Sequence, residues 1–296
     1  MRLRAIIAIS LLTGLAAAPA GCKGPGDERV GPITLKPLVP KGGPPVKRMY
    51  QVRTVLLRHR LRPDTPIEDV WRLLGTTGMS HEKRALWEAN DLRLGDGAGL
   101  AAERLNELLT ETPDRTAKVR DLVVPENLDF AIALGGERET VDLVWTDAAG
   151  RLVGRHFDTA AIRFRVVCRR DPADPAAVCI ALVPEIQYGP ERMRWIRTEK
   201  GHAQRMGRSA CVLSDLAAEV RLPPGRLLVI GPTSPEAGPG ISFGTAAFFE
   251  RRGPDTWQET IILTAQPAAP GKVPRAGKIP FLPPAKPRPG TGKAAK

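Results

Sequence analysis

The stretch "AIRFRVVCRR" (161–170), "DPADPA" (171–176), "AVCIALVPEIQYG" (177–189) decides how the central part of this chain folds. Both outer segments alternate apolar with polar residues, which is typical of strands that bury one face. The Asp/Pro-rich segment between them predicts a turn, so the two strands form an antiparallel hairpin. An earlier hairpin is predicted where "TVDLVWT" (140–146) and "RLVGRHF" (151–157) flank "DAAG" (147–150).

The register of the central hairpin determines whether two of the cysteines face each other. A turn centred between Ala173 and Asp174 sets Cys168 directly opposite Cys179. Opposed residues of an antiparallel pair can approach to a Cα separation of about 4.5 Å, which a disulfide can span. In an oxidising compartment we therefore predict a Cys168–Cys179 disulfide. The alternative is two buried thiols, and Cys211 is interpreted as a small buried apolar residue.

Outward from this hairpin, the pattern predicts two regions of different character. A strand is expected at 49–57, followed by helices at about 65–75, from Ser80 onward and at 101–111. From about residue 118 the period changes to two, and further strands are expected in "RMRWIRTE", "CVLSDLAAEVRL", "GRLLVIG" and "TWQETIILTA". The predicted fold class is α+β, with a helix-rich N-terminal part to about residue 117 and a mostly antiparallel sheet or sandwich behind it. Whether 47–265 forms one domain or two stays open.

The N-terminus predicts export from the cytosol. Residues 1–21 combine Arg2 and Arg4 with an apolar run and a small-residue cluster, which is typical of a signal peptide. The apolar run is shorter than the roughly 20 residues that span a bilayer. Ala20-Gly21-Cys22 resembles the lipobox of bacterial lipoproteins, and this resemblance implies acylation of Cys22, whereas Pro19 departs from the pattern. The alternative is cleavage after Ala20 with no lipid. Lys23 after the cysteine favours the outer membrane as the destination.

The formal net charge of +12 lies mainly outside the folded region. Residues 22–46 form a Pro/Gly-rich linker, and residues 47–265 carry a net charge of only +1. The near-neutral folded region argues against nucleic-acid binding. Residues 266–296 form a Pro-rich tail that we expect to be disordered. Its seven basic residues are interpreted as contacts to anionic envelope polymers or lipid heads, or as a solubilising segment: Lys272, Arg275, Lys278, Lys286, Arg288, Lys293 and Lys296.

Motifs for catalysis and cofactors do not converge. "GISFG" (240–244) resembles a nucleophile elbow around Ser242, but no histidine follows it in the order that hydrolases use. "LGDGAG" (94–99) and "PGTGK" (289–293) lack the spacing of dinucleotide or phosphate loops. The histidines are scattered, and no C-x-x-C or H-E-x-x-H motif occurs. We therefore predict no catalytic site, no metal site and no cofactor.

Three blocks carry a resemblance to known proteins. They are "LWEANDLRLGDGAGLAAERLNELL" (86–109), "CVLSDLAAEVRLPPGRLLVIGP" (211–232) and "SFGTAAFFERRGPDTWQETIILTA" (242–265). Together they resemble uncharacterised cell-envelope proteins of planctomycetes, although Asp91 and Phe243 depart from that pattern. The last two blocks also resemble, more loosely, the β-domain of secretins. The planctomycete resemblance implies an envelope location and no particular activity.

The sequence thus predicts an exported, lipid-anchored envelope protein on the periplasmic side, held at the outer membrane, with a non-enzymatic binding or scaffolding role. Two alternatives remain open. One is an accessory subunit of a secretin-like export apparatus that docks by adding a strand to a sheet. The other is a hydrolase whose site is assembled from residues scattered along the sequence.

Overall fold

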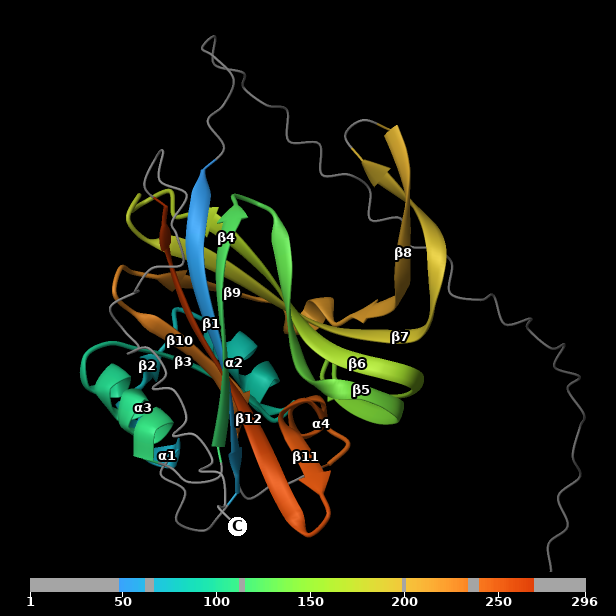
Figure 1. Ribbon diagram of the computed structural model, residues 1–296, viewed down its shortest axis with the longest axis horizontal. Helices are drawn as coiled ribbons and strands as arrows, with labels where there is room; N and C mark the ends of the chain where they lie inside the picture. The colour runs from blue at the N-terminus through green and yellow to red at the C-terminus, as the bar shows by residue number, and fades with distance from the viewer. Residues whose placement is uncertain (1–47, 62–66, 112–114, 199–200, 234–239, 269–296) are drawn as a thin grey trace, which may run out of the picture. The chain divides into compact units, whose positions relative to one another are not determined.

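Figure 1 shows a computed structural model that describes residues 48–61, 67–111, 115–198, 201–233 and 240–268. Several sequence predictions lie outside these residues. They are the signal peptide, Cys22, the linker to residue 46 and the seven basic residues of the tail. These stay predictions.

The described residues form two antiparallel sheets. The seven strands of the first, which we call sheet A, are β1 (Met49–Arg60), β2 (Gly75–Thr76), β3 (Leu92–Gly97), β4 (Arg115–Pro125), β10 (Leu227–Pro232), β11 (Phe249–Arg252) and β12 (Asp255–Pro267). They follow the order β2-β3-β10-β12-β1-β4, with β11 pairing with β12. The five strands of sheet B are β5 (Asp129–Thr146), β6 (Leu152–Arg170), β7 (Val178–Thr198), β8 (Gly201–Val212) and β9 (Ala218–Leu222), and β9 pairs with β7. The helices are α1 (Ile67–Leu73), α2 (His81–Glu88), α3 (Leu100–Glu111), α4 (Phe243–Phe248) and a 3-10 turn, η1 (Ser214–Leu216).

The predicted α+β class with a helix-rich N-terminal part is wrong, because the described chain is mostly strand with four short α-helices. The three helices expected before residue 117 do exist, and Ser80 caps α2 by accepting a hydrogen bond from the Lys83 amide. They alternate, however, with β1, β2 and β3. β3 arises from "LRLGDG", where no strand was predicted. Its partner β10 lies more than 100 residues further along, beyond the reach of a local pattern.

The main core lies between the two sheets. Phe164 of β6 is at its centre, with ring centroids 6.2 Å from Trp87, 6.2 Å from Phe243 and 6.1 Å from Phe248. The Trp87 indole Nε1 is also buried and donates a hydrogen bond to the Leu216 carbonyl at 2.9 Å. From Ala160 to Cys168, the even-numbered residues of β6 are buried and face this core, because side chains alternate along a strand. The odd-numbered residues from Ala161 to Arg169 therefore lie on the outer face of sheet B.

A second, smaller core covers the opposite face of sheet A. Val55 of β1 and Ile262 of β12 pack there with Val70 of α1 and Leu105 of α3. The central strands of sheet A are consequently buried on both faces, and all six residues of β10 are buried.

Asn90 joins three segments near the main core. Its side-chain amide donates to the Leu86 and Thr146 carbonyls, and its Oδ1 accepts from the Thr146 amide. The Asn90 carbonyl accepts a hydrogen bond from the Gly244 amide of α4 at 2.9 Å. A Cβ atom at residue 244 would lie 2.0 Å from the Asp91 carbonyl oxygen. Only glycine therefore permits this approach of α4 to the end of α2.

The predicted Cys168–Cys179 disulfide is wrong by one residue of register. The hairpin forms as expected, but Cys168 pairs with Ile180, and Cys179 pairs with Arg169. A shift of one residue places the two side chains on opposite faces of the sheet. Cys168 is buried in the core, Cys179 lies on the outer face, and both are free thiols, as is Cys211.

Candidate functional site

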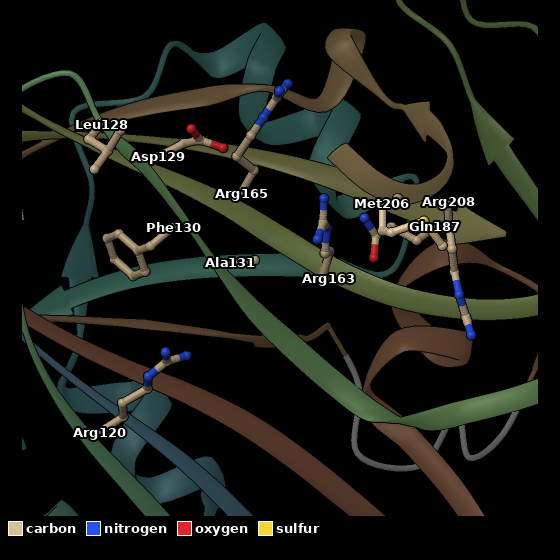
Figure 2. A pocket seen from close by; sticks show the side chains of 11 residues that line it. Arg120, Leu128, Asp129, Phe130, Ala131, Arg163, Arg165, Gln187, Met206 and Arg208 are labelled. Carbon is tan, nitrogen blue, oxygen red and sulfur yellow. The ribbon is translucent and has the colours of Figure 1, made fainter. Parts of the chain in front are cut away.

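The outer face of sheet B holds a groove lined by arginines. Arg163 and Arg165 occupy consecutive outward positions on β6, so both guanidinium groups lie on the face opposite the core. With β4 alongside, this face encloses a cavity of about 730 Å³ (Figure 2). The lining residues are Arg120, Leu128, Asp129, Phe130, Ala131, Arg163, Arg165, Gln187, Met206, Gly207 and Arg208.

One buried carboxylate holds the two central arginines. Glu185 of β7 is 2% exposed and lies opposite Arg163 in the strand register. Its Oε1 accepts hydrogen bonds from Arg163 Nη2 at 2.5 Å and Nε at 3.2 Å. Its Oε2 lies 3.8 Å from Arg165 Nε. Two guanidinium groups thus share a single carboxylate, which fixes their position on the sheet.

The other two arginines close the ends of the groove. Arg208 of β8 pairs with Glu137 at 2.6 Å, and this hydrogen bond raises the pKa of the guanidinium above its ordinary value. Glu137 lies at an irregularity of β5 between Leu134 and Arg138, where the register with β6 shifts. Arg120 comes from β4 of sheet A, and within the part of the chain that the structure describes no carboxylate lies within 4.0 Å of it.

The charge balance of the groove favours an anion. Four guanidinium groups face three carboxylates, which belong to Asp129, Glu137 and Glu185. Each guanidinium has five N–H donors in a planar fork that fits carboxylate, phosphate or sulfate oxygens. The ion pairs use only part of these donors. The remaining N–H donors support binding of an anion.

Ser242 has a structural role in the fold. It is the N-cap of α4, and its Oγ accepts a hydrogen bond from the Thr245 amide and lies 2.7 Å from Thr245 Oγ1. This short helix then carries Phe243 and Phe248 into the main core. The "GISFG" segment therefore positions a buried helix.

Two of the four histidines lie in contrasting environments, one buried without a hydrogen-bond partner among the described residues and one exposed between two carboxylates. His59 of β1 is 3% exposed, and neither of its ring nitrogens has a hydrogen-bond partner among the described residues. Burial lowers its pKa to about 4. His156 of β6 is exposed, with Nδ1 2.7 Å from Asp142 and Nε2 3.1 Å from Asp158. Across the described ranges, no group of three histidine, cysteine or carboxylate side chains is arranged to hold a metal ion.

Sequence reasoning did not select the groove residues. Arg163 and Arg165 could have been found, since both fall on the polar positions of the "AIRFRVVCRR" alternation. Arg120 could not, because β4 is placed by its pairing with the distant β1, and Arg208 could not, because no strand was predicted over residues 201–210.

Comparison with known proteins gives few matches. No protein-family model matches the chain, and no curated protein matches it either. Among solved structures, the chain is similar to the InvG secretin domain β-barrel from the Salmonella SPI-1 injectisome, with 10% identity, a TM-score of 0.25, and coverage of 78% of this chain and 66% of that one. It is also similar to the V. cholerae type IV competence pilus secretin PilQ, with 9% identity, a TM-score of 0.23, and 75% and 60% coverage.

A third similar structure is the Klebsiella pneumoniae type II secretion system outer membrane complex of PulD, PulS and the PulC HR domain, with 11% identity, a TM-score of 0.23, and 75% and 40% coverage. The chain spans less than two thirds of the length of each of these structures. The looser of the two sequence resemblances, to secretin β-domains, thus has weak counterparts among solved structures, and the planctomycete resemblance has none here. No residue role is transferred from these similarities. Among the described residues, no helix has the length and apolar character to cross a membrane.

Proposed function

We propose that this chain is an exported envelope protein with a non-enzymatic binding role, and that the arginine-lined groove is its site for an anionic ligand. The observation that supports this is the convergence of four guanidinium groups from β4, β6 and β8 on one cavity. A ligand with phosphate, sulfate or carboxylate groups would accept bidentate hydrogen bonds there.

The location of the protein belongs to the same proposal. A signal peptide over residues 1–21 and a lipid on Cys22 would hold the chain at the periplasmic side of the outer membrane. The seven basic tail residues would add a salt-sensitive contact with anionic envelope material. These features are supported by the sequence pattern and can be tested by mass spectrometry of the N-terminal peptide, where an unmodified Gly21 terminus would remove the lipid anchor.

Titration with tripolyphosphate tests the groove. The probe is titrated at low ionic strength into the full chain and into an Arg163→Gln/Arg165→Gln double variant. The dissociation constant should rise at least tenfold in this variant. The matched control, Arg169→Gln/Arg170→Gln, removes the same charge from exposed positions of the same strand and should change it less than twofold. Equal losses in both variants would overturn the proposal.

The double variant leaves Glu185 without its two arginine partners, so a loss of binding could reflect misfolding. A single substitution elsewhere in the groove avoids this problem. Arg120→Gln removes a guanidinium that has no ion pair within the described residues, so the fold should be unaffected. We expect it to weaken tripolyphosphate binding by about threefold to tenfold. Unchanged affinity in this variant would also count against the groove.

A second candidate function, subunit docking by sheet addition, is favoured by one edge of sheet A. β4 pairs with β1 along one side, and among the described strands none pairs with its other side. Its residues 116–121 are exposed, and Val119 is an apolar side chain among them. An exposed edge of this length is a template for an added strand.

The test of this candidate is extraction of the protein in mild detergent. Sheet addition predicts a complex of uniform stoichiometry that Val119→Lys disrupts, since a charge on an edge strand blocks pairing. Leu152→Lys, at an exposed position of the β5–β6 hairpin, should leave the complex intact. Recovery of the wild-type chain only as a free monomer would exclude this function.

A further inference from the structure

The distal part of the β7–β8 hairpin leaves the body of sheet B. The pairing of β7 with β6 ends at Gln187, and the register between β7 and β8 shifts between Tyr188 and Arg192. Beyond that irregularity, residues 192–198 pair with residues 201–207, so that this section is a two-stranded ribbon. Figure 1 shows it projecting past the other strands of sheet B. We call residues 190–198 and 201–209 the ribbon.

Three large apolar side chains of the ribbon are in contact with solvent. Trp195 is 68% exposed, Met193 is 59% exposed and Met206 is 52% exposed. Met193 and Met206 are direct cross-strand partners, and Trp195 is two residues beyond Met193, so all three lie on one face. Trp87 is buried and packs in the main core, whereas Trp195, Met193 and Met206 form an exposed apolar patch on a two-stranded element. Such a patch marks an interaction surface.

The ribbon is also the basic part of the folded region. Its residues, "PERMRWIRT" and "GHAQRMGRS", contain five arginines against one glutamate, a net charge of +4. Residues 47–265 as a whole carry +1, so the rest of that region carries −3. The positive charge of the folded region is therefore concentrated on the same element that exposes the apolar side chains.

We infer that the ribbon docks on the surface of an anionic phospholipid bilayer, with Trp195, Met193 and Met206 inserted at the level of the headgroups. Tryptophan is enriched at this depth because its ring is apolar and its N–H is polar. The arginines of the same ribbon would bind lipid phosphates, which supply the complementary charge. Methionine is flexible enough to fit between irregularly spaced acyl chains.

The inference does not depend on the ligand of the groove or on a lipid at Cys22. Met206 does line both surfaces, so a lipid headgroup held by the ribbon would lie near the arginines of the groove. A second copy of the chain, or an acidic protein, could also cover an apolar and basic patch. The charge distribution and the exposed tryptophan favour the bilayer, and the experiment separates these outcomes.

The test is flotation of the full chain with lipid vesicles. Cys22→Ser removes any contribution of acylation, and glutamine at the seven basic tail positions removes that of the tail. Vesicles of phosphatidylglycerol and phosphatidylcholine in a 3:7 ratio are compared with pure phosphatidylcholine. We expect binding to the anionic vesicles to be at least tenfold stronger and to weaken with salt. Equal binding to both vesicle types would overturn the inference.

Substitutions in the ribbon locate the contact. Trp195→Ala/Met193→Ala should lower the partition coefficient at least fivefold, while Leu152→Ala, an exposed residue on another hairpin, should leave it within twofold. Trp195→Phe should retain most of the binding but lose the part of the fluorescence that brominated lipids quench. Unchanged partitioning of the double variant would refute the inference. A lipid-free dimer that the double variant dissociates would also refute it, since a second copy would then cover the patch.

Discussion

The central strands of sheet A carry buried side chains on both faces, whereas β6 of sheet B alternates buried with partly exposed positions. The difference follows from what lies on each side. Sheet A has sheet B against one face and α1 and α3 against the other. Sheet B has only the main core on its inner face. Its outer face is left for ion pairs and the arginine-lined groove.

The packed side chains that stabilise the fold and the groove proposed to bind an anion thus lie in different parts of the molecule. The central strands of sheet A provide a continuous apolar layer and accept few changes, because a substitution of a buried side chain there meets packed atoms. The outer face of sheet B and the ribbon hold their polar and exposed groups with few packing constraints. The following experiments test whether that division holds.

The largest difference is expected for apolar truncation. Ile262→Ala in sheet A removes a side chain that is 2% exposed and should lower the free energy of unfolding by about 4 kcal/mol. Val183→Ala, on the outer face of sheet B, should cost about 1 kcal/mol, since its side chain is partly solvated already. Urea unfolding measures both. Similar costs would show that the outer face is as tightly packed as the interior of sheet A.

Acid should act on sheet A through His59. Its pKa is about 4 in the folded state and 6.5 when unfolded, so between these values only the unfolded chain binds the proton. The free energy of unfolding should therefore fall as the pH drops from 6.5 to 4, by on the order of 3 kcal/mol. His59→Gln should remove this component of the pH dependence. Identical slopes for the two proteins would contradict a buried, neutral His59.

A smaller effect is expected at the one carboxylate that holds the groove arginines. Glu185→Gln keeps the shape of the side chain but removes the charge that Arg163 and Arg165 share. We expect a loss of about 2 kcal/mol in unfolding free energy. Glu219→Gln is the matched control, because its carboxylate is exposed and 3.8 Å from Arg169, and it should change stability by less than about 0.5 kcal/mol.

The smallest effect is expected at His156, on the solvent side of sheet B. Hydrogen bonds to Asp142 and then Asp158 raise its pKa above the ordinary 6.5. The stabilisation from its positive charge is fully present below pH 6.5 and is lost as the pH rises through the raised value. An NMR titration of the ring should show the raised pKa, and Asp142→Asn should lower it. A pKa unchanged by that substitution would exclude the pairing.

Local patterns predicted the first three helices and many of the strands, but neither β3 nor most of β8, and not how the strands assemble into sheets. The alternation in 161–189 predicted the β6–β7 hairpin, which the pairing confirms. Its register failed because the turn is centred on Asp174, one half-residue later than assumed. There, Asp171 Oδ1 accepts from the Ala173 amide and Asp174 Oδ1 accepts from the Ala176 amide. Side-chain hydrogen bonds of this kind set the length of a turn and leave no trace in hydrophobic periodicity.

The candidate site shows the same limit. Alternation places Arg163 and Arg165 on one face of β6, but it does not show that this face is open to solvent. That depends on where sheet A lies. The sequence did not predict the exposure of Trp195 either, since "RMRWIRTE" has the pattern of an ordinary half-buried strand. Only the end of the β6 pairing at Gln187 leaves it without a covering layer.

One feature of sheet A bears on how the protein is made. β1 begins at Met49 and β12 ends at Pro267, yet they are neighbours in the middle of the sheet. β12 also pairs with β10 and β11. The hydrogen bonds that β1, β10 and β11 form with β12 can therefore form only after Asp255–Pro267 has emerged from the ribosome. Sheet A can therefore complete its native pairing only after β12 has been synthesised. Pairings between segments far apart in the chain also form slowly. Until β12 has paired, β1 and β10 each lack one of the two strands that flank them in sheet A.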